Sequence, residues 1–256
     1  MTNKTKVMSM DEAMRKAGLG DGSRILLSGF VGAGEPTCCI EWMVEKNIKD
    51  LTVICNTPGM NGFGKAMLFK NNCIKELISS HVGTTAESTE EYVNGRLYIE
   101  QFYPMGTWAE KVRAGAVGLG GVLVPVGVGI LDKEGLFPEV EKQGKQKEIV
   151  HVNGMDCIVE PALTAPIAMV QAWRADEIGN LQYRGTSRNN NHDMAMAGTF
   201  TIAEVSEIVP VGTIPPENVG TPGPFIDAIV QGLSIEEHDE LYRRHWLKIG
   251  KLAQEN

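Results

Sequence analysis

Three closely spaced glycines are the clearest candidate for a ligand-binding loop in this chain. The apolar residues 25–27 lead into Gly29, Gly32 and Gly34, and a segment with helix-forming residues starts at Thr37. Glycines let a backbone approach a ligand closely, and the free N–H groups at the start of a helix can meet an oxyanion, a carboxylate or a phosphate. The pattern therefore predicts an anion-binding loop between a strand and a helix. A tight turn without a ligand is the alternative.

Several common catalytic and binding motifs are missing. The glycine spacing G-x-x-G-x-G differs from the G-x-G-x-x-G of dinucleotide-binding loops, and no Gly-Lys-Ser/Thr follows it. The five cysteines contain no C-x-x-C pair, and the five histidines contain no H-E-x-x-H. We therefore expect neither a disulfide framework nor a bound metal, and the cysteines should pack as small hydrophobic residues.

Length, composition and charge restrict the class of protein. The chain has 256 residues, and its contents of 43% hydrophobic and 22% charged residues are ordinary for a soluble globular protein. The net charge of −8 argues against a nucleic-acid-binding surface. No apolar segment reaches the roughly 18 residues of a membrane-spanning helix. We expect a cytoplasmic protein that contacts neither nucleic acid nor a membrane.

Strand, loop and helix alternate along the first half of the chain, about every 25 residues. The expected strands are 25–27, 51–55, 74–79 and 97–102, and the expected helices are 37–46, 65–71, 89–94 and 107–113. This order predicts an α/β fold: an open, mostly parallel sheet with helices on both faces. The ends of parallel strands meet at one edge, where ligands bind in such folds. The loops that carry residues 32–34, 56–57, 80–81 and 104–105 are expected there.

The second half of the chain predicts a small insertion and further core elements. Residues 148–152 and 155–159 flank Asn153 and Gly154, which predicts an antiparallel hairpin with a two-residue turn. Residues 114–129 are interpreted as a closely packed or mobile loop, and 130–147 as a charged surface excursion. No internal repeat is recognised. Further strands are expected at 165–172 and 200–205, a helix at 191–197, and residues 225–230 form a last apolar run.

The last residues differ in pattern from the rest. Residues 234–256 alternate charged with apolar residues, which predicts an amphipathic helical tail. This tail would follow one compact domain formed by residues 1–233. It could pack either on a partner or on its own domain.

Residues 21–36 resemble the N-terminal signature of the family I coenzyme A transferases, in their A (alpha) subunit. The signature reads Asp-Gly, two residues, three aliphatic residues, Gly-Gly-Phe, three residues, Gly, any residue and Pro. This chain differs from it only at the first glycine of Gly-Gly-Phe, where it has Ser28. Further blocks resemble the family in the same order, at 104–120, 125–129, 175–189 and 219–223. The resemblance implies the CoA-transferase fold, of the acetate/butyrate–acetoacetate or 3-oxoacid type.

The resemblance also implies a mechanism that this chain cannot complete alone. In the family, a glutamate of the B (beta) subunit first attacks an acyl-CoA, and CoA then passes to a free carboxylic acid with ping-pong kinetics. That glutamate lies in a Glu-Asn-Gly motif, which is missing here because Glu217 and Asn218 are followed by Val219. The implied assembly is αβ or α2β2, with no catalytic residue in this chain. CoA thioester is a substrate, and no cofactor is bound permanently.

The family places loops of the alpha chain against the partner's glutamate, where they shape the pocket for the acid. The substrate-binding residues that this implies are Gly32, Ala33, Gly34, Asn56, Thr57, His81 and Met105. The amide of Asn56 can bind a carboxylate or a carbonyl, although it could instead close its own turn before Pro58. Met105 stands where the family has a glutamine, which favours a longer or more apolar acyl group.

Other polar residues and other functions remain open. His81 could act as a general base, although the family mechanism needs no histidine. Glu87 is interpreted as a carboxylate at a helix N-terminus. Arginines at positions 174, 184 and 188 could meet CoA phosphates, but are interpreted as structural or interface residues. The alternative functions are a subunit of an acyl-CoA hydrolase or of a C–C cleaving enzyme of the same fold, and a sugar-phosphate sensor.

Overall fold

The computed structural model describes residues 5–130 and 147–253, and its centre is an eight-stranded sheet. The strand order is β11-β10-β8-β1-β2-β3-β4, and β9 pairs with β8. All neighbours are parallel except β9, so the predicted mostly parallel sheet is confirmed. The strands are β1 Arg24–Leu27, β2 Leu51–Ile54, β3 Ile74–Ser79, β4 Tyr98–Phe102, β8 Ala165–Asp176, β9 Leu181–Gln182, β10 Gly198–Val209 and β11 Ala228–Gln231.

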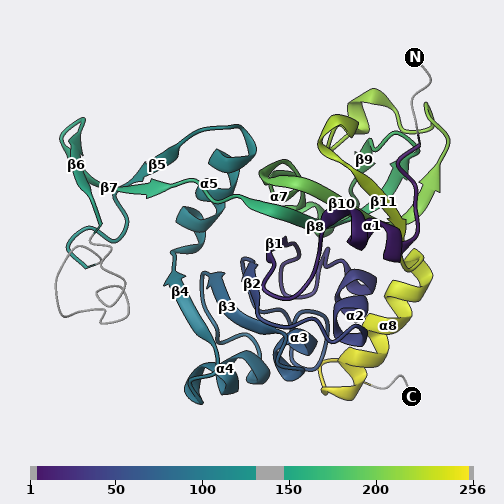
Figure 1. The fold of residues 1–256 in the computed structure, drawn as a ribbon, viewed down its shortest axis with the longest axis horizontal. Helices are drawn as coiled ribbons and strands as arrows, with labels where there is room; N and C mark the ends of the chain where they lie inside the picture. The colour runs from purple at the N-terminus through teal and green to yellow at the C-terminus, as the bar shows by residue number, and fades with distance from the viewer. Residues whose placement is uncertain (1–4, 131–146, 254–256) are drawn as a thin grey trace.

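Helices cover both faces of this sheet (Figure 1). Neighbouring residues of β1 point to opposite faces, as a strand requires. Ile25 packs in one apolar cluster with Met43, whereas Leu26 packs in the other with Trp108 and Val112. The first cluster involves α1 Met10–Ala17, α2 Thr37–Glu45 and α3 Ala66–Lys70; the second involves α5 Met105–Ala116 and α7 Asn191–Ala197.

Some boundaries differ from the sequence prediction. Helix α4, Ala86–Val93, starts three residues early because the hydroxyl of Thr85 accepts a hydrogen bond from Ser88 N at 3.1 Å and caps it. Strand β8 continues through Trp173, which was expected near its end, because β10 pairs with it as far as Asp176. Short 3₁₀ turns connect the later elements, at Gly185–Arg188, Pro216–Asn218 and Gly223–Phe225.

A second, three-stranded antiparallel sheet projects from the main body (Figure 1). It contains β5 Gly121–Val124, β6 Ile149–Val152 and β7 Met155–Pro161, in the order β5-β7-β6. The hairpin of β6 and β7 was predicted, and its turn residues Asn153 and Gly154 have the expected positive φ of 52° and 80°. The interpretation of 121–124 as a loop was wrong, since β7 offers these residues a pairing edge. The predicted surface excursion lies mainly outside the described residues.

A buried charge cluster attaches this small sheet to α5. Glu160 of β7 accepts hydrogen bonds from Lys111 Nζ at 2.6 Å and from Lys147 Nζ at 2.8 Å. Lys111 Nζ also lies 4.1 Å from the ring centre of Tyr103. The side chains of Lys111 and Glu160 are only 2% and 1% exposed, so this contact is shielded from water.

The N-terminus of α2 is capped from a distant strand. Pro36 provides no side-chain cap. Instead, the buried carboxylate of Glu204 in β10 accepts hydrogen bonds from Cys38 N at 3.1 Å and Cys39 N at 2.9 Å. The positive end of the helix favours this negative charge, but burial is the larger influence and raises the pKa of Glu204.

The predicted tail helix is present as α8, Ile235–Lys248, and it packs on its own chain. Ser234 and Glu237 form a reciprocal capping box at its start. The Tyr242 hydroxyl donates to Gly32 O, and its ring lies 5.1 Å from that of Phe63. None of the residues of α8 is fully buried, so the helix is held mainly by contacts of one face.

The shifted pKa of Glu204 predicts a pH-dependent stability. A carboxyl group whose pKa is raised on folding stabilises most below its ordinary pKa of 4.5, and this contribution falls as the pH rises through the folded-state pKa. Glutamine imitates the neutral group, so the free energy of unfolding of wild type minus that of Glu204→Gln should decrease with rising pH. Urea unfolding of both proteins at a series of pH values measures this difference in the free energy of unfolding. The exposed Glu217→Gln is the control, and a pH-independent difference for Glu204→Gln would contradict the assignment.

Candidate functional site

The loop after β1 is a tight turn closed by its own backbone. Phe30 N donates to Ala33 O at 2.9 Å, and Ala33 N donates to Phe30 O at 3.0 Å. Between them, Val31 and Gly32 have φ angles of 46° and 91°. Glycine adopts such angles freely, whereas a β-branched residue rarely does. The backbone N–H of Val31 is held by a 3.3 Å hydrogen bond to Thr57 Oγ1, which helps to keep this strained residue in place.

The loop after β2 repeats the same pattern. Residues 59–64 again read G-x-x-G-x-G, thirty positions after residues 29–34, and all six glycines have positive φ. Phe63 N donates to Met60 O at 3.2 Å and closes the turn. The sequence interpretation that the chain has no internal repeat was therefore wrong for these two loops.

A buried ion pair joins the two loops. Glu35 and Lys65 each follow the third glycine of a loop, and Glu35 Oε1 lies 3.3 Å from Lys65 Nζ with both side chains at most 1% exposed. Glu35 also accepts hydrogen bonds from Gly32 N and Lys65 N, each at 3.1 Å. Lys65 Nζ donates to Ser28 O at 3.0 Å and Gly29 O at 2.7 Å. Each charged group thus binds backbone as well as its partner.

Packing within the chain accounts for several of these glycines. A Cβ atom on Gly29 would lie 2.1 Å from Glu35 Cγ, and one on Gly64 would lie 2.0 Å from Glu35 Oε2. A Cβ atom on Gly34 would lie 2.5 Å from the backbone oxygen of Ser187. The sequence suggested that glycine is needed where a ligand approaches the backbone. The structure shows that packing within the chain also requires glycine at these positions.

Asn56 and Thr57 lie directly beneath the first loop, where β2 ends. Both are buried, and the hydroxyl of Thr57 accepts the hydrogen bond from Val31 N. Asn56 O accepts hydrogen bonds from the hydroxyls of Ser79 at 3.0 Å and Ser80 at 2.7 Å. The side-chain Oδ1 of Asn56 is buried without a hydrogen-bond partner among the described residues, so it does not close its own turn.

His81 and Met105 follow the next two strands at the same edge. His81 Nδ1 lies 2.7 Å from Ser80 Oγ, and burial lowers the pKa of His81, which keeps the ring neutral at pH 7. Met105 is the first residue of α5. The glycine loop is hydrogen-bonded to Thr57, and the neighbouring Asn56 is connected to His81 through the hydroxyl of Ser80. Met105 takes part in none of these hydrogen bonds.

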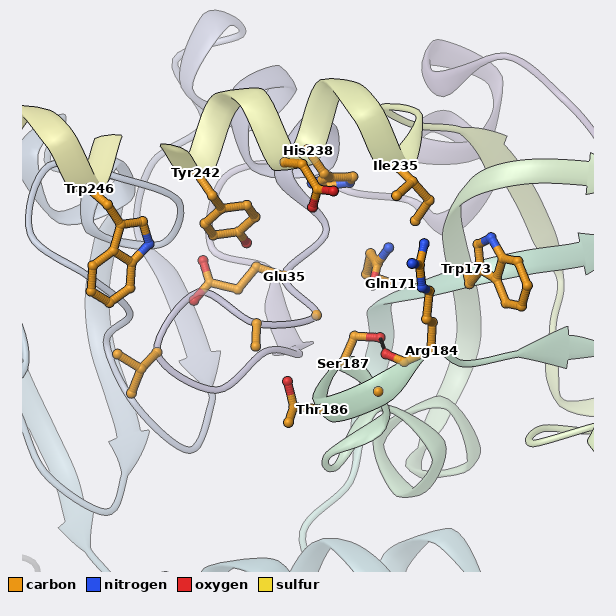
Figure 2. Close-up of a pocket in the computed structure, with 15 residues that line it drawn as sticks. Glu35, Gln171, Trp173, Arg184, Thr186, Ser187, Ile235, His238, Tyr242 and Trp246 are labelled. Atoms are coloured by element: carbon orange, nitrogen blue, oxygen red, sulfur yellow. Dashed lines mark hydrogen bonds between the residues drawn. The ribbon is translucent and has the colours of Figure 1, made fainter. Parts of the chain in front are cut away.

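A cavity of about 450 Å³ opens beside the first glycine loop (Figure 2). Its floor includes Ala33 and Gly34 of that loop, and Figure 2 shows α8 along its upper side. The lining residues that the sequence interpretation did not assign to a pocket are Val31, Glu35, Gln171, Trp173, Arg184, Gly185, Thr186, Ser187, Ile235, His238, Asp239, Tyr242 and Trp246. Apart from Val31 and Glu35, they come from the second half of β8, from the segment 184–187 within the family-like block 175–189, and from the tail, and no motif marks those of β8 and the tail.

Two other polar residues have structural partners. Glu87 Oε1 accepts a hydrogen bond from Gly62 N at 2.7 Å, so it supports the second glycine loop. Arg174 Nε donates to Glu207 Oε2 at 2.6 Å, which agrees with its interpretation as a structural residue. In the described ranges, histidine, cysteine and acidic side chains form no metal-binding group, and no helix there is long and apolar enough to cross a bilayer.

Comparison with known proteins decides the family. The family profile described as "Coenzyme A transferase" matches residues 7–232. The chain belongs to this family. It is 40% identical over 231 residues to a probable coenzyme A transferase alpha chain of Bacillus subtilis, covering 90% of this chain and 95% of that protein. It is 38% identical over 211 residues to the "Acetoacetyl-CoA:acetate/butyrate CoA transferase alpha subunit" of Clostridium acetobutylicum, covering 82% and 91%.

Solved structures confirm the fold of this transferase chain. Glutaconate coenzyme A-transferase from Acidaminococcus fermentans matches with a TM-score of 0.78 at 23% identity, over 97% of this chain and 85% of that chain. An acyl-CoA transferase from Escherichia coli O157:H7 matches with a TM-score of 0.73 at 19% identity, over 90% of this chain. The chain spans about half of that structure, 48% of its length. Helix α8 follows the part that the family profile covers.

The ion pair of the transferase chain predicts a large effect of one substitution. Lys65→Met leaves the Glu35 carboxylate buried without its counter-charge, which should lower the free energy of unfolding by about 3–5 kcal/mol. Chemical denaturation measures the change. Arg113→Met, which removes the exposed ion pair with Glu110, is the control and should change stability little. Equal losses for the two variants would show that the pair at 35 and 65 does not secure the loops.

Proposed function

We propose that the chain is the A (alpha) subunit of a heteromeric CoA transferase that moves CoA from an acyl-CoA to a free carboxylic acid. The observation that carries this proposal is the near full-length match to relatives named as alpha subunits, together with the absence of Glu-Asn-Gly. The carboxylate nearest to the glycine loop, Glu35, is buried and bound to Lys65, so it is unsuited to nucleophilic attack.

The nucleophile of the proposed reaction is a glutamate of a beta subunit. Its carboxylate attacks the thioester carbonyl and expels CoA thiolate, which gives a mixed anhydride. The thiolate then attacks the glutamyl carbonyl, releasing the first acid and leaving a glutamyl-CoA thioester. The acceptor acid reverses these steps and leaves as its CoA ester. CoA is therefore a substrate and not a resident cofactor, and the kinetics are ping-pong.

The role proposed for this chain is to bind and orient the acid at the edge of the sheet. Each tetrahedral intermediate carries a negative oxygen, which N–H donors stabilise when they are already in position. The Nδ2 group of Asn56 is the donor proposed for this task, while its Oδ1, which makes no hydrogen bond among the described residues, is left to accept one from a substrate. Gly32, Ala33, Gly34, Thr57, His81 and Met105 would complete the wall that faces the partner. The assembly proposed is αβ or α2β2, in the metabolism of fatty acids or ketoacids.

The first prediction of this proposal concerns the isolated chain. Because it contains no Glu-Asn-Gly, it should transfer no CoA by itself, and addition of a beta subunit should restore ping-pong turnover. Acyl exchange between acyl-CoA and a labelled acid, with and without the partner, measures this. Ping-pong turnover by the mass-verified single chain would falsify the proposal. Release of free CoA by the complex without an acceptor, at a comparable rate, would instead support a hydrolase.

The second prediction concerns Met105. An amide at this position can donate a hydrogen bond to a substrate carbonyl, whereas a thioether offers only apolar contact. Met105→Gln should therefore shift the ratio of kcat/KM for acetoacetate over butyrate upward, roughly ten- to a hundredfold if one buried hydrogen bond is gained. The ratio is measured in the assembled complex, with Met155→Gln on the small sheet as control. An unchanged ratio would place Met105 outside the acyl pocket.

A further inference from the structure

Gln171 lines the cavity beneath α8 and has a buried polar atom that the described part of the chain leaves unsatisfied. Gln171 is only 6% exposed, and its Nε2 donates to Ala172 O at 3.0 Å. A carbonyl oxygen accepts only, so this contact fixes which end of the amide carries the NH₂ group. The other end, Oε1, is buried without a partner among the described residues. A ligand with an N–H or O–H group would satisfy this acceptor.

Two opposite charges line the same cavity without an ion pair in the described ranges. Arg184 approaches it from the segment after β9, and Asp239 approaches it from α8. The other ionisable groups of the cavity are already accounted for. Glu35 is paired with Lys65, and burial lowers the pKa of His238, which leaves its ring neutral at pH 7. Among the described residues, the cavity therefore offers one free cation and one free anion.

The remaining lining combines aromatic and apolar side chains with the hydroxyl-bearing residues Thr186 and Ser187. Figure 2 shows Trp246, Tyr242 and Ile235 extending from α8 toward the loops, with Trp173 beside Arg184 on the opposite side. The Arg184 guanidinium lies 5.8 Å from the ring centre of Trp173, which helps to orient it. A cavity of about 450 Å³ that combines aromatic walls with several polar groups has the size of a site for a small, polar organic molecule.

We propose that this cavity binds a small amino-carboxylic acid, with its carboxylate on Arg184 and its ammonium group between Asp239 and Gln171 Oε1. A simple fatty acid would satisfy Arg184 but leave Gln171 Oε1 and Asp239 without a donor. A dicarboxylic acid would direct a second negative charge toward Asp239. Only a ligand with both charges meets all three groups. The identification of this ligand as the acid substrate of the transferase rests on the function proposed above. The binding of the ligand to the cavity does not depend on that function.

The test is calorimetric titration of the full chain with matched acids. The pairs are 3-aminopropanoate and propanoate, 4-aminobutyrate and butyrate, and 5-aminopentanoate and pentanoate. The three chain lengths test different distances between the carboxylate and the ammonium group. Succinate is the dicarboxylic acid. We expect at least one amino acid to bind tenfold or more tightly than its matched acid and than succinate. Failure of every amino acid to bind, or equal affinity within all pairs, overturns the proposal.

Substitutions test the two charged groups separately. Asp239→Asn should reduce the preference for the amino acid over its matched acid to about one. Arg184→Gln should abolish binding of both. The control variants are Glu240→Gln, next to Asp239 on α8, and Arg188→Gln, in the 3₁₀ turn, and they should retain wild-type affinity. Circular dichroism of each variant checks that α8 is still formed. Loss of preference in the controls as well would contradict the assignment to Arg184 and Asp239.

Turnover in the assembled complex separates this inference from the proposed function. If the amino acid binds but the complex transfers CoA to no acid, the site stands and the transferase proposal fails. If the complex transfers CoA to butyrate or acetoacetate but no amino acid binds, the transferase proposal stands and this inference fails.

Discussion

The ion pair of Glu35 and Lys65 is the constraint on which the loops at the sheet edge depend. Removing two charges from water is costly, and a buried pair contributes to stability only when additional hydrogen bonds satisfy both groups. Here Glu35 accepts two backbone N–H groups and Lys65 donates to two backbone carbonyls. Because these backbone groups belong to both loops, neither loop can move without breaking bonds to a buried charge.

The same requirement explains the glycines around the pair and recurs elsewhere in the fold. A side chain at Gly29 would occupy the space of Glu35 Cγ, and one at Gly64 the space of the Glu35 carboxylate, so the repeated G-x-x-G-x-G pattern is a packing requirement as much as a feature of binding. Buried acidic residues also connect distant elements at two other places. Glu204 of β10 caps α2, and Glu160 of β7 holds Lys111 of α5. Buried carboxylates thus connect elements of the fold that lie far apart in the sequence.

The sequence predicted the parts of the fold that depend on local pattern. Apolar runs and turn residues identified the main strands, the Asn153–Gly154 hairpin and the tail helix, since each signal lies within a few neighbouring residues. It did not reveal β5, whose residues follow a glycine-rich run and form a strand because β7 offers a pairing edge. It also did not reveal the ion pair, because its partners lie thirty residues apart, although the repeated glycine spacing was a visible signal. The cavity required the docked position of α8, which no local pattern contains.

The cavity at the edge of the sheet therefore lies between the first glycine loop, which is held firmly, and α8, which is held less firmly. The glycine loop is fixed from below by Glu35, which binds Gly32 N, while the carbonyl of the same residue accepts the Tyr242 hydroxyl from α8. Helix α8 has no fully buried residue of its own and contributes none to the two apolar clusters, so fewer buried contacts oppose its release than that of the helices in those clusters. Movement of α8 would break the hydrogen bond from Tyr242 to Gly32 O, whereas the ion pair and its bond to Gly32 N would still hold the loop. This arrangement allows a ligand to enter beside a rigid binding surface, and a ligand that contacts both the loop and α8 would itself hold α8 in place.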